Sequence, residues 1–85
     1  MKIEFAGTAK VADDGGVVHP AKVDGQDLVC HFSYELLEEL DPDNLKSDPM
    51  AQFETHKFRL LSIAEQKILR GLSHNGVVNI FTSDL

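Results

Sequence analysis

Polar and apolar residues alternate at the start of the chain, which predicts a short strand. In the segment 2–5 the apolar residues Ile3 and Phe5 fall on one side, which is expected to face inward. The following segment, 7–16, is mostly small and contains Asp and Gly, which favour turns. This segment therefore predicts a loop.

A hairpin over residues 17–32 is the strongest short-range signal. Two β-rich stretches flank Asp24-Gly25, a dipeptide that favours a type I′ turn. With these as the turn residues, the predicted cross-strand pairs on one face are Val23 with Gln26, Ala21 with Leu28, His19 with Cys30, and Val17 with Phe32. Pro20 has no N–H to donate, so its strand is predicted to lie at an edge or at a bulge.

Two helices are predicted after the hairpin. Ser33 is the expected N-cap of a short helix over 34–40, in which leucines recur at helical spacing. Asp48 and Pro49 then mark the start of a long helix that runs to Gly71, its expected C-terminal cap. One arc of this helix collects the apolar residues Met50, Phe53, Leu60, Leu61, Ala64, Ile68 and Leu72.

A final strand is predicted over 77–81, after the turn signal Asn75-Gly76. The whole pattern predicts one α+β domain over residues 1–85. It has a small antiparallel sheet of about four strands packed on one long and one short helix, in the order β-β-β-α-α-β. A chain of 85 residues buries only a modest core, so self-association would add stability.

A resemblance to a known family rests on segments spread over nearly the whole chain. They are Pro20-Ala21-Lys22-Val23-Asp24-Gly25 with Cys30, Ser33 with Leu36-Leu37, and Phe53-Glu54-Thr55-His56-Lys57 with Ala64-Glu65-Gln66-Lys67 and Gly71. With these segments the chain resembles the small bacterial proteins known as domain of unknown function 1488. The resemblance implies a compact α+β fold and a bacterial source. That family has no established activity, so the resemblance assigns no catalytic residue.

The composition, with 42% hydrophobic and 26% charged residues, is that of a globular protein. Neither a signal peptide nor an apolar run long enough for a membrane span is present, so we expect no export and no membrane insertion. The single cysteine, Cys30, cannot form an intrachain disulfide, which favours the cytoplasm. The net charge of −6 disfavours nucleic acid as a partner unless basic residues cluster on one face.

The predicted long helix provides such a cluster. Its basic flank, an arc of about 80° beside the apolar stripe, contains His56, Arg59, Lys67 and Arg70. This flank could bind a phosphate-bearing ligand, a nucleic-acid backbone or an acidic partner surface, including the acidic segment of a second copy. Nucleic acid is the least favoured of these, because the sequence has no recognised nucleic-acid-binding motif and few aromatic residues to stack on bases. An ordinary solvated flank is the competing interpretation. Phe58, Ile63 and Leu69 lie outside the main stripe, which indicates a second contact surface. Either the helix is buried on two sides within the monomer or it packs against a partner, and the small core favours a homodimer.

Other candidates for chemistry are weaker. His19 and Cys30 could be two zinc ligands or part of a small pocket, but no third ligand is near in sequence. Asp41-Pro42-Asp43 imitates the start of an EF-hand loop, yet Lys46 stands where that loop needs glycine. We therefore predict no metal, no cofactor and no catalytic residue.

The leading hypothesis is a non-enzymatic interaction or regulatory module that acts through the long helix. The alternatives are an anion-binding module that uses the basic flank and a small enzyme with a pocket near His19 and Cys30. A catalytic role for Lys57, which falls within the apolar arc, belongs to the enzyme alternative.

Overall fold

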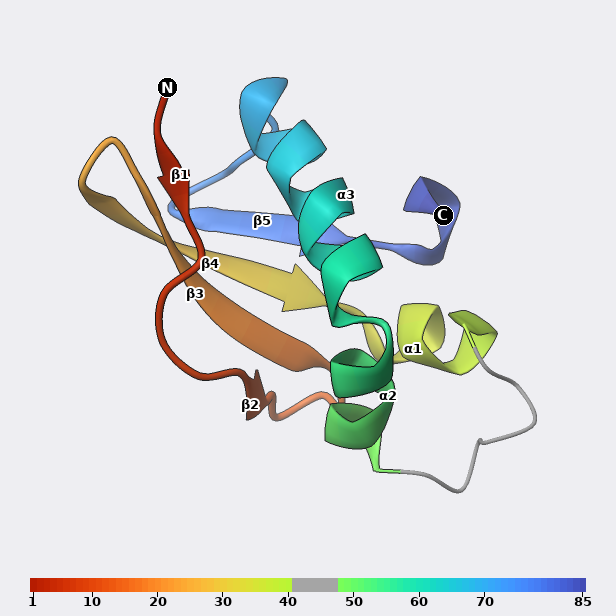
Figure 1. Cartoon of the computed structure of the whole chain (residues 1–85). Helices are drawn as coiled ribbons and strands as arrows, with labels where there is room; N and C mark the ends of the chain where they lie inside the picture. The colour runs from red at the N-terminus through yellow and green to blue at the C-terminus, as the bar shows by residue number, and fades with distance from the viewer. Residues whose placement is uncertain (41–47) are drawn as a thin grey trace.

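In the residues that the structure describes, a five-stranded sheet and three α-helices make up an α+β fold (Figure 1). The computed structural model describes residues 1–40 and 48–85. The elements are β1 (Ile3–Glu4), β2 (Lys10–Val11), β3 (Val17–Val23), β4 (Gln26–Phe32), α1 (Tyr34–Leu40), α2 (Pro49–Thr55), α3 (Lys57–Leu69), β5 (Val77–Ile80) and the 3₁₀ turn η2 (Thr82–Asp84). The EF-hand-like segment 41–46 lies outside the described residues.

The predicted hairpin is confirmed in its register. Strands β3 and β4 pair antiparallel, with Val17 opposite Phe32, His19 opposite Cys30, Ala21 opposite Leu28 and Val23 opposite Gln26. Asp24 adopts a positive φ of 51° and Gly25 one of 85°, as a type I′ turn requires. The turn therefore fixes which side chains of the hairpin face the core.

The first strand is confirmed, and the predicted loop contains a short strand that the pattern did not indicate. Strand β1 pairs with the end of β3, while β2 pairs with its beginning. Pro20 lies in the gap between them, where β3 has no partner on that side, so its missing N–H breaks no ladder. The connecting chain passes close over the proline: a Cβ on Gly7 would lie 2.7 Å from Pro20 Cγ.

The last strand is correctly predicted, but its direction is not. Strand β5 pairs parallel with β4, with Val29 opposite Val77 and Phe32 opposite Ile80. The sheet is therefore mixed, in the order β1-β3-β4-β5 with β2 also on β3, and not wholly antiparallel. A parallel pair needs a crossover connection, which the helices between β4 and β5 supply.

Both helix starts are confirmed. Ser33 Oγ accepts from the Leu36 N–H at 3.1 Å, and Asp48 Oδ1 accepts from the Met50 N–H at 3.1 Å. The predicted continuous helix over 49–71 is wrong, because it is interrupted at His56. The residue adopts φ −110° and ψ 18°, outside the helical region.

A local side-chain hydrogen bond lies next to the interruption, and helical periodicity does not reveal it. Thr55 Oγ1 donates to the Ala51 carbonyl at 2.9 Å, a side-chain bond that bends helices. Helix α3 ends at Leu69, and Gly71 follows in the left-handed region at φ 72°, as expected of a C-terminal cap. Leu72 therefore lies beyond the helix.

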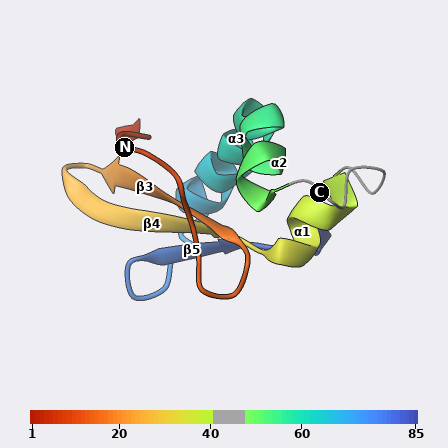
Figure 2. The same ribbon diagram turned by 90° about the horizontal axis from the view of Figure 1, so that it is seen from below.

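Helices α2 and α3 lie on one side of the sheet, as Figure 2 shows edge-on. The core between them contains Val17, Ala21, Cys30, Phe32, Val78 and Ile80 from the sheet and Phe53, Leu60, Ala64 and Ile68 from the helices. Of the described helices, none covers the opposite side of the sheet (Figure 2). The outer side of α3 and that open side of the sheet are thus the broad surfaces of the molecule.

Candidate functional site

The outward side of α3 carries a row of apolar side chains that the monomer leaves exposed. Phe58 is 90% exposed, Leu69 is 50% exposed and Leu72, just after the helix, is 52% exposed. Phe58 and Leu69 are eleven residues apart, which places them about 20° from each other around a helix of 3.6 residues per turn. The inward side of the same helix is formed by the buried Leu60, Ala64 and Ile68.

Arginines flank this row. Arg59 and Arg70 are both exposed, and the exposed Glu65 lies between Phe58 and Leu69 in sequence. We call the surface formed by Phe58, Arg59, Leu69, Arg70 and Leu72 the outer face of α3. It combines large apolar side chains with positive charge on a protein whose net charge is −6.

The structure separates the four predicted basic-flank residues. Arg59 and Arg70 belong to the outer face, but they are eleven residues apart, about 16 Å along a helix axis at 1.5 Å per residue. His56 lies at the junction between α2 and α3 and is partly buried. Its Nε2 atom is buried without a hydrogen-bond partner among the described residues. A single small anion cannot contact all of these groups.

Lys67, the fourth of them, is held by the chain's own C-terminal segment. Its Nζ donates to the Asn79 carbonyl at 2.6 Å and to Asp84 Oδ2 at 2.8 Å. The ammonium also lies 5.4 Å from the centre of the Phe81 ring. Only 14% of the Lys67 side chain is exposed. We call Lys67, Asn79, Phe81 and Asp84 the Lys67 cluster; its cation is already paired.

The Lys67 cluster closes the free edge of the sheet. The Ile80 carbonyl points towards β4, where it accepts from the Ser33 N–H at 3.1 Å, so the alternate carbonyl of Asn79 points away from β4. The Lys67 ammonium donates to that carbonyl, and Asp84 accepts from the Phe81 N–H at 2.8 Å. Further back along β5, Val77 exchanges backbone hydrogen bonds with His74. An edge covered in this way is a poor template for an added strand.

His19 and Cys30 are neighbours across the hairpin, as predicted, and both are in the core. His19 is 2% exposed; its ring lies between Phe5 and Phe53, and its Nδ1–H donates to the Pro20 carbonyl at 2.7 Å. Cys30 is fully buried, and this burial raises the pKa of its thiol to about 11. A thiol in that environment stays protonated and is a poor nucleophile.

Lys57, the third residue of the enzyme alternative, is partly exposed at the start of α3. No hydrogen bond joins it to His19 or Cys30 among residues 1–40 and 48–85. Within those same residues, no group of three or more His, Cys, Asp or Glu side chains has the arrangement of a metal site. No described helix is long and apolar enough to cross a membrane.

The open side of the sheet has one polar contact of note. Asp14 Oδ2 lies 2.9 Å from His31 Nε2, and Asp14 Oδ1 accepts from the Gly16 N–H at 2.9 Å. The Gly16 hydrogen bond is the main cause that lowers the pKa of Asp14, and His31 adds to it. The contact fastens the loop before β3 onto β4.

A pocket at the tip of the hairpin was not predicted. It lies between the β3–β4 turn and the C-terminal end of α3, and its volume is about 430 Å³. Asp24-Gly25 and Gly71 were assigned as turn and cap residues, and periodicity along the sequence does not show that these two ends meet in space. We call this the hairpin pocket.

Comparisons with known proteins place the chain in a structural context. The family model described as protein of unknown function (DUF1488) matches residues 3–78. The chain is similar to a protein of unknown function from the DUF1488 family of Shewanella loihica PV-4, known from a crystal structure at 1.60 Å resolution. That similarity has a TM-score of 0.74 at 18% sequence identity and covers 92% of this chain and 90% of the other. No curated protein matches the chain.

Proposed function

Because the chain belongs to the DUF1488 family, whose function is unknown, its role has to be inferred from its own surface, and we propose that it is a small non-enzymatic interaction module. The partner binds through the outer face of α3. One observation carries this proposal: Phe58 is 90% exposed in a chain that buries Phe32 and Phe53 completely. Aromatic side chains and arginines are enriched at protein interaction surfaces.

The energetics favour covering this surface. Burying one large apolar side chain contributes about 1.5–3 kcal/mol, and aromatic and Arg residues are enriched among the residues that dominate binding energy. Phe58 with Arg59 fits that composition. Leu69 at the end of the helix and Leu72 beyond it add exposed apolar surface near Arg70. A groove or helix of complementary shape would cover the whole row.

A second copy of this chain is the partner that we propose. Helix α1 carries Glu35, Glu38 and Glu39 and no basic residue, whereas the outer face of α3 carries Arg59 and Arg70. In a twofold-symmetric dimer each copy can present its α3 to the acidic α1 of the other. Association through side chains also suits a sheet whose β5 edge is occupied by the Lys67 cluster.

We place this module in the bacterial cytoplasm. Its one cysteine is buried as a free thiol, which suits a reducing compartment. The family resemblance implies the bacterial source. A regulatory role would follow if dimer formation competed with another acidic partner for the outer face.

Sedimentation velocity over a range of protein concentrations tests the proposal. The wild type is expected to sediment as a concentration-dependent dimer, and Phe58→Ser as a monomer with unchanged thermal stability at low concentration. Val11→Ser is the matched control, because Val11 is 50% exposed on β2, away from α3. It should dimerise like the wild type. A wild type that stays monomeric at all concentrations would refute the homodimer, and a dimer unaffected by Phe58→Ser would refute this surface.

A further inference from the structure

Strand β5 is an edge strand without charges of its own. Of the described strands, only β4 lies beside it. Residues 71–83 contain no Asp, Glu, Lys or Arg, and Val77, Val78 and Ile80 within them favour extended backbone. An uncharged, β-prone edge is a template on which further strands add, and proteins usually protect such an edge with charges or a covering segment.

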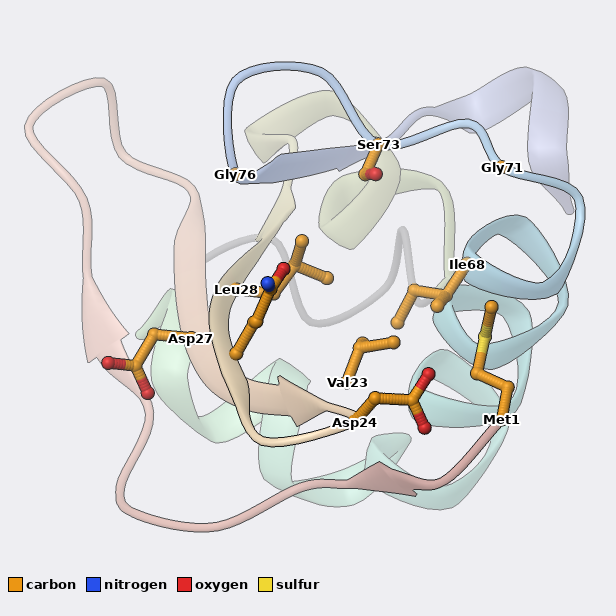
Figure 3. A pocket seen from close by; sticks show the side chains of 10 residues that line it. Met1, Val23, Asp24, Asp27, Leu28, Ile68, Gly71, Ser73 and Gly76 are labelled. Atoms are coloured by element: carbon orange, nitrogen blue, oxygen red, sulfur yellow. The ribbon is translucent and has the colours of Figure 1, made fainter.

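The start of β5 is covered by the loop that precedes it. Figure 3 shows this loop, in which Gly71, Ser73 and Gly76 line the hairpin pocket. Within it, the His74 N–H donates to the Val77 carbonyl at 2.8 Å, and the Val77 N–H donates to the His74 carbonyl at 3.0 Å. Both outward backbone groups of Val77 are therefore paired within the chain.

The end of β5 is covered by the Lys67 cluster. The backbone groups of Asn79 and Phe81 point away from β4, and Phe81 continues the extended backbone at φ −116° and ψ 169°. Lys67 Nζ donates to the Asn79 carbonyl. Asp84 binds both backbone groups of Phe81: its Oδ2 accepts from the N–H at 2.8 Å, and its own N–H donates to the carbonyl at 2.9 Å. The Lys67 and Asp84 side chains, only 14% and 24% exposed, are joined at 2.8 Å.

The covered groups are those that a twofold strand pair would use. In an antiparallel pair, two residues directly opposite each other exchange both backbone hydrogen bonds. With the twofold axis at Ile80, Asn79 of one copy lies opposite Phe81 of the other, because each is one residue from the axis. The Phe81 N–H then donates to the facing Asn79 carbonyl. The Asn79 N–H, which has no partner among the described residues, donates to the facing Phe81 carbonyl.

We propose that η2 is a strap, fastened by the ion pair of Lys67 with Asp84, that prevents β5 from pairing with β5 of a second copy. While the strap is closed, the Asn79 carbonyl and both backbone groups of Phe81 are used within the chain. When it is open, the same groups pair between two copies. A second copy is the occupant that this edge favours, because two uncharged strands meet without the like-charge repulsion that opposes strand pairing. This edge is separate from the outer face of α3.

Amide hydrogen exchange of the full chain, followed by NMR at low and at high protein concentration, tests the strap. The Lys67→Met, Asp84→Ala double variant removes one positive and one negative charge, so the net charge stays −6. In the wild type the Phe81 amide is expected to be protected at both concentrations. In the double variant it should exchange roughly tenfold to a hundredfold faster at low concentration, the scale of a lost hydrogen bond to a charged group. At high concentration it should regain protection as the strands pair.

Two added substitutions identify the surface. Asn79→Lys places a charge on β5 itself and should abolish the regained protection, because edge lysines block strand addition. Thr8→Lys adds the same charge between β1 and β2, at the other edge of the sheet, and should leave it unchanged. The amides of Val78 and Ile80, in the ladder with β4, should stay protected throughout.

Four results would each overturn the proposal. They are an unchanged Phe81 amide in the double variant, no protection regained at high concentration, equal effects of the two added lysines, and exchange of Val78 and Ile80 as fast as that of Phe81. The last result would mean that the strap does not open separately from the sheet.

Discussion

A cationic side chain lies beside an aromatic one on two sides of α3. One such pair is held within the chain, and the other is exposed to solvent. On one side Lys67 lies by the Phe81 ring and is bonded to Asn79 and Asp84, so its cation is satisfied within the chain. On the other side Phe58 and Arg59 stand in solvent. An aromatic residue beside a cation can therefore stabilise the fold or stay exposed to a partner. The two sides of α3 differ because the C-terminal segment packs against only one of them.

The largest expected difference in the free energy of unfolding is between variants of the two phenylalanines on either side of the helix break. Phe53 is fully buried against Phe32 and His19, whereas Phe58 is 90% exposed. Phe53→Ala should lower the free energy of unfolding by about 3–5 kcal/mol, because it leaves a cavity in the core. Phe58→Ala should change it by less than about 0.5 kcal/mol. Urea denaturation at low protein concentration measures both, and similar losses would contradict the assigned orientation of α3.

Replacing Lys67 should have an intermediate effect. Lys67→Met removes the donor to Asn79 and leaves the partly buried Asp84 without its cation, at a cost of about 1–3 kcal/mol in the free energy of unfolding. Arg70→Met, three residues later on the exposed side, is the matched control and should cost less than about 0.5 kcal/mol. Equal costs would mean that the Lys67 cluster contributes no net stability.

Acid should weaken the Lys67 cluster by a smaller amount. Burial opposes ionisation of Asp84, but the hydrogen bonds from Lys67 and Phe81, with the charge of Arg70, outweigh it and lower the pKa of Asp84 from its ordinary 3.8. A lowered folded-state pKa stabilises the fold above about pH 4, and the contribution is lost as the pH falls through the folded value.

Unfolding free energies near neutral pH and at about pH 3 check this linkage. Asp84→Asn should be less stable than the wild type near neutral pH and lose less on acidification. Lys67→Met should show the same flattened pH dependence, and the double variant should add little to either. A pH dependence in Asp84→Asn as steep as that of the wild type would assign the acid sensitivity to other carboxylates, among them Asp14.

Local chemistry was sufficient to predict the hairpin, its register and both helix starts. Asp24-Gly25 specifies the turn, and the period of two along β3 and β4 then determines which residues face the core. Ser33 and Asp48 accept from N–H groups two or three residues away. Each of these features depends on atoms that are close in sequence.

The apolar pattern does not encode the remaining features. The parallel direction of β5 follows from how the helices cross the sheet, and the break at His56 comes directly after Thr55, whose hydroxyl donates to the Ala51 carbonyl. For the site, sequence periodicity placed Lys67 on an open basic flank, because nothing local to it indicates that Asn79 and Asp84 lie within bonding distance. Helical geometry alone places Phe58 and Leu69 outside the main stripe, and the structure leaves both exposed rather than burying that side of the helix within the monomer.

The most direct test of the interaction surface is an isotope-filtered NMR experiment on a mixture of labelled and unlabelled protein, which detects only contacts between copies. The account predicts intermolecular NOEs from the Phe58 ring to side chains of α1, and from Leu69 to the facing copy. Intermolecular NOEs that arise solely from the open side of the sheet or from the β5 edge, with none from Phe58, would contradict it.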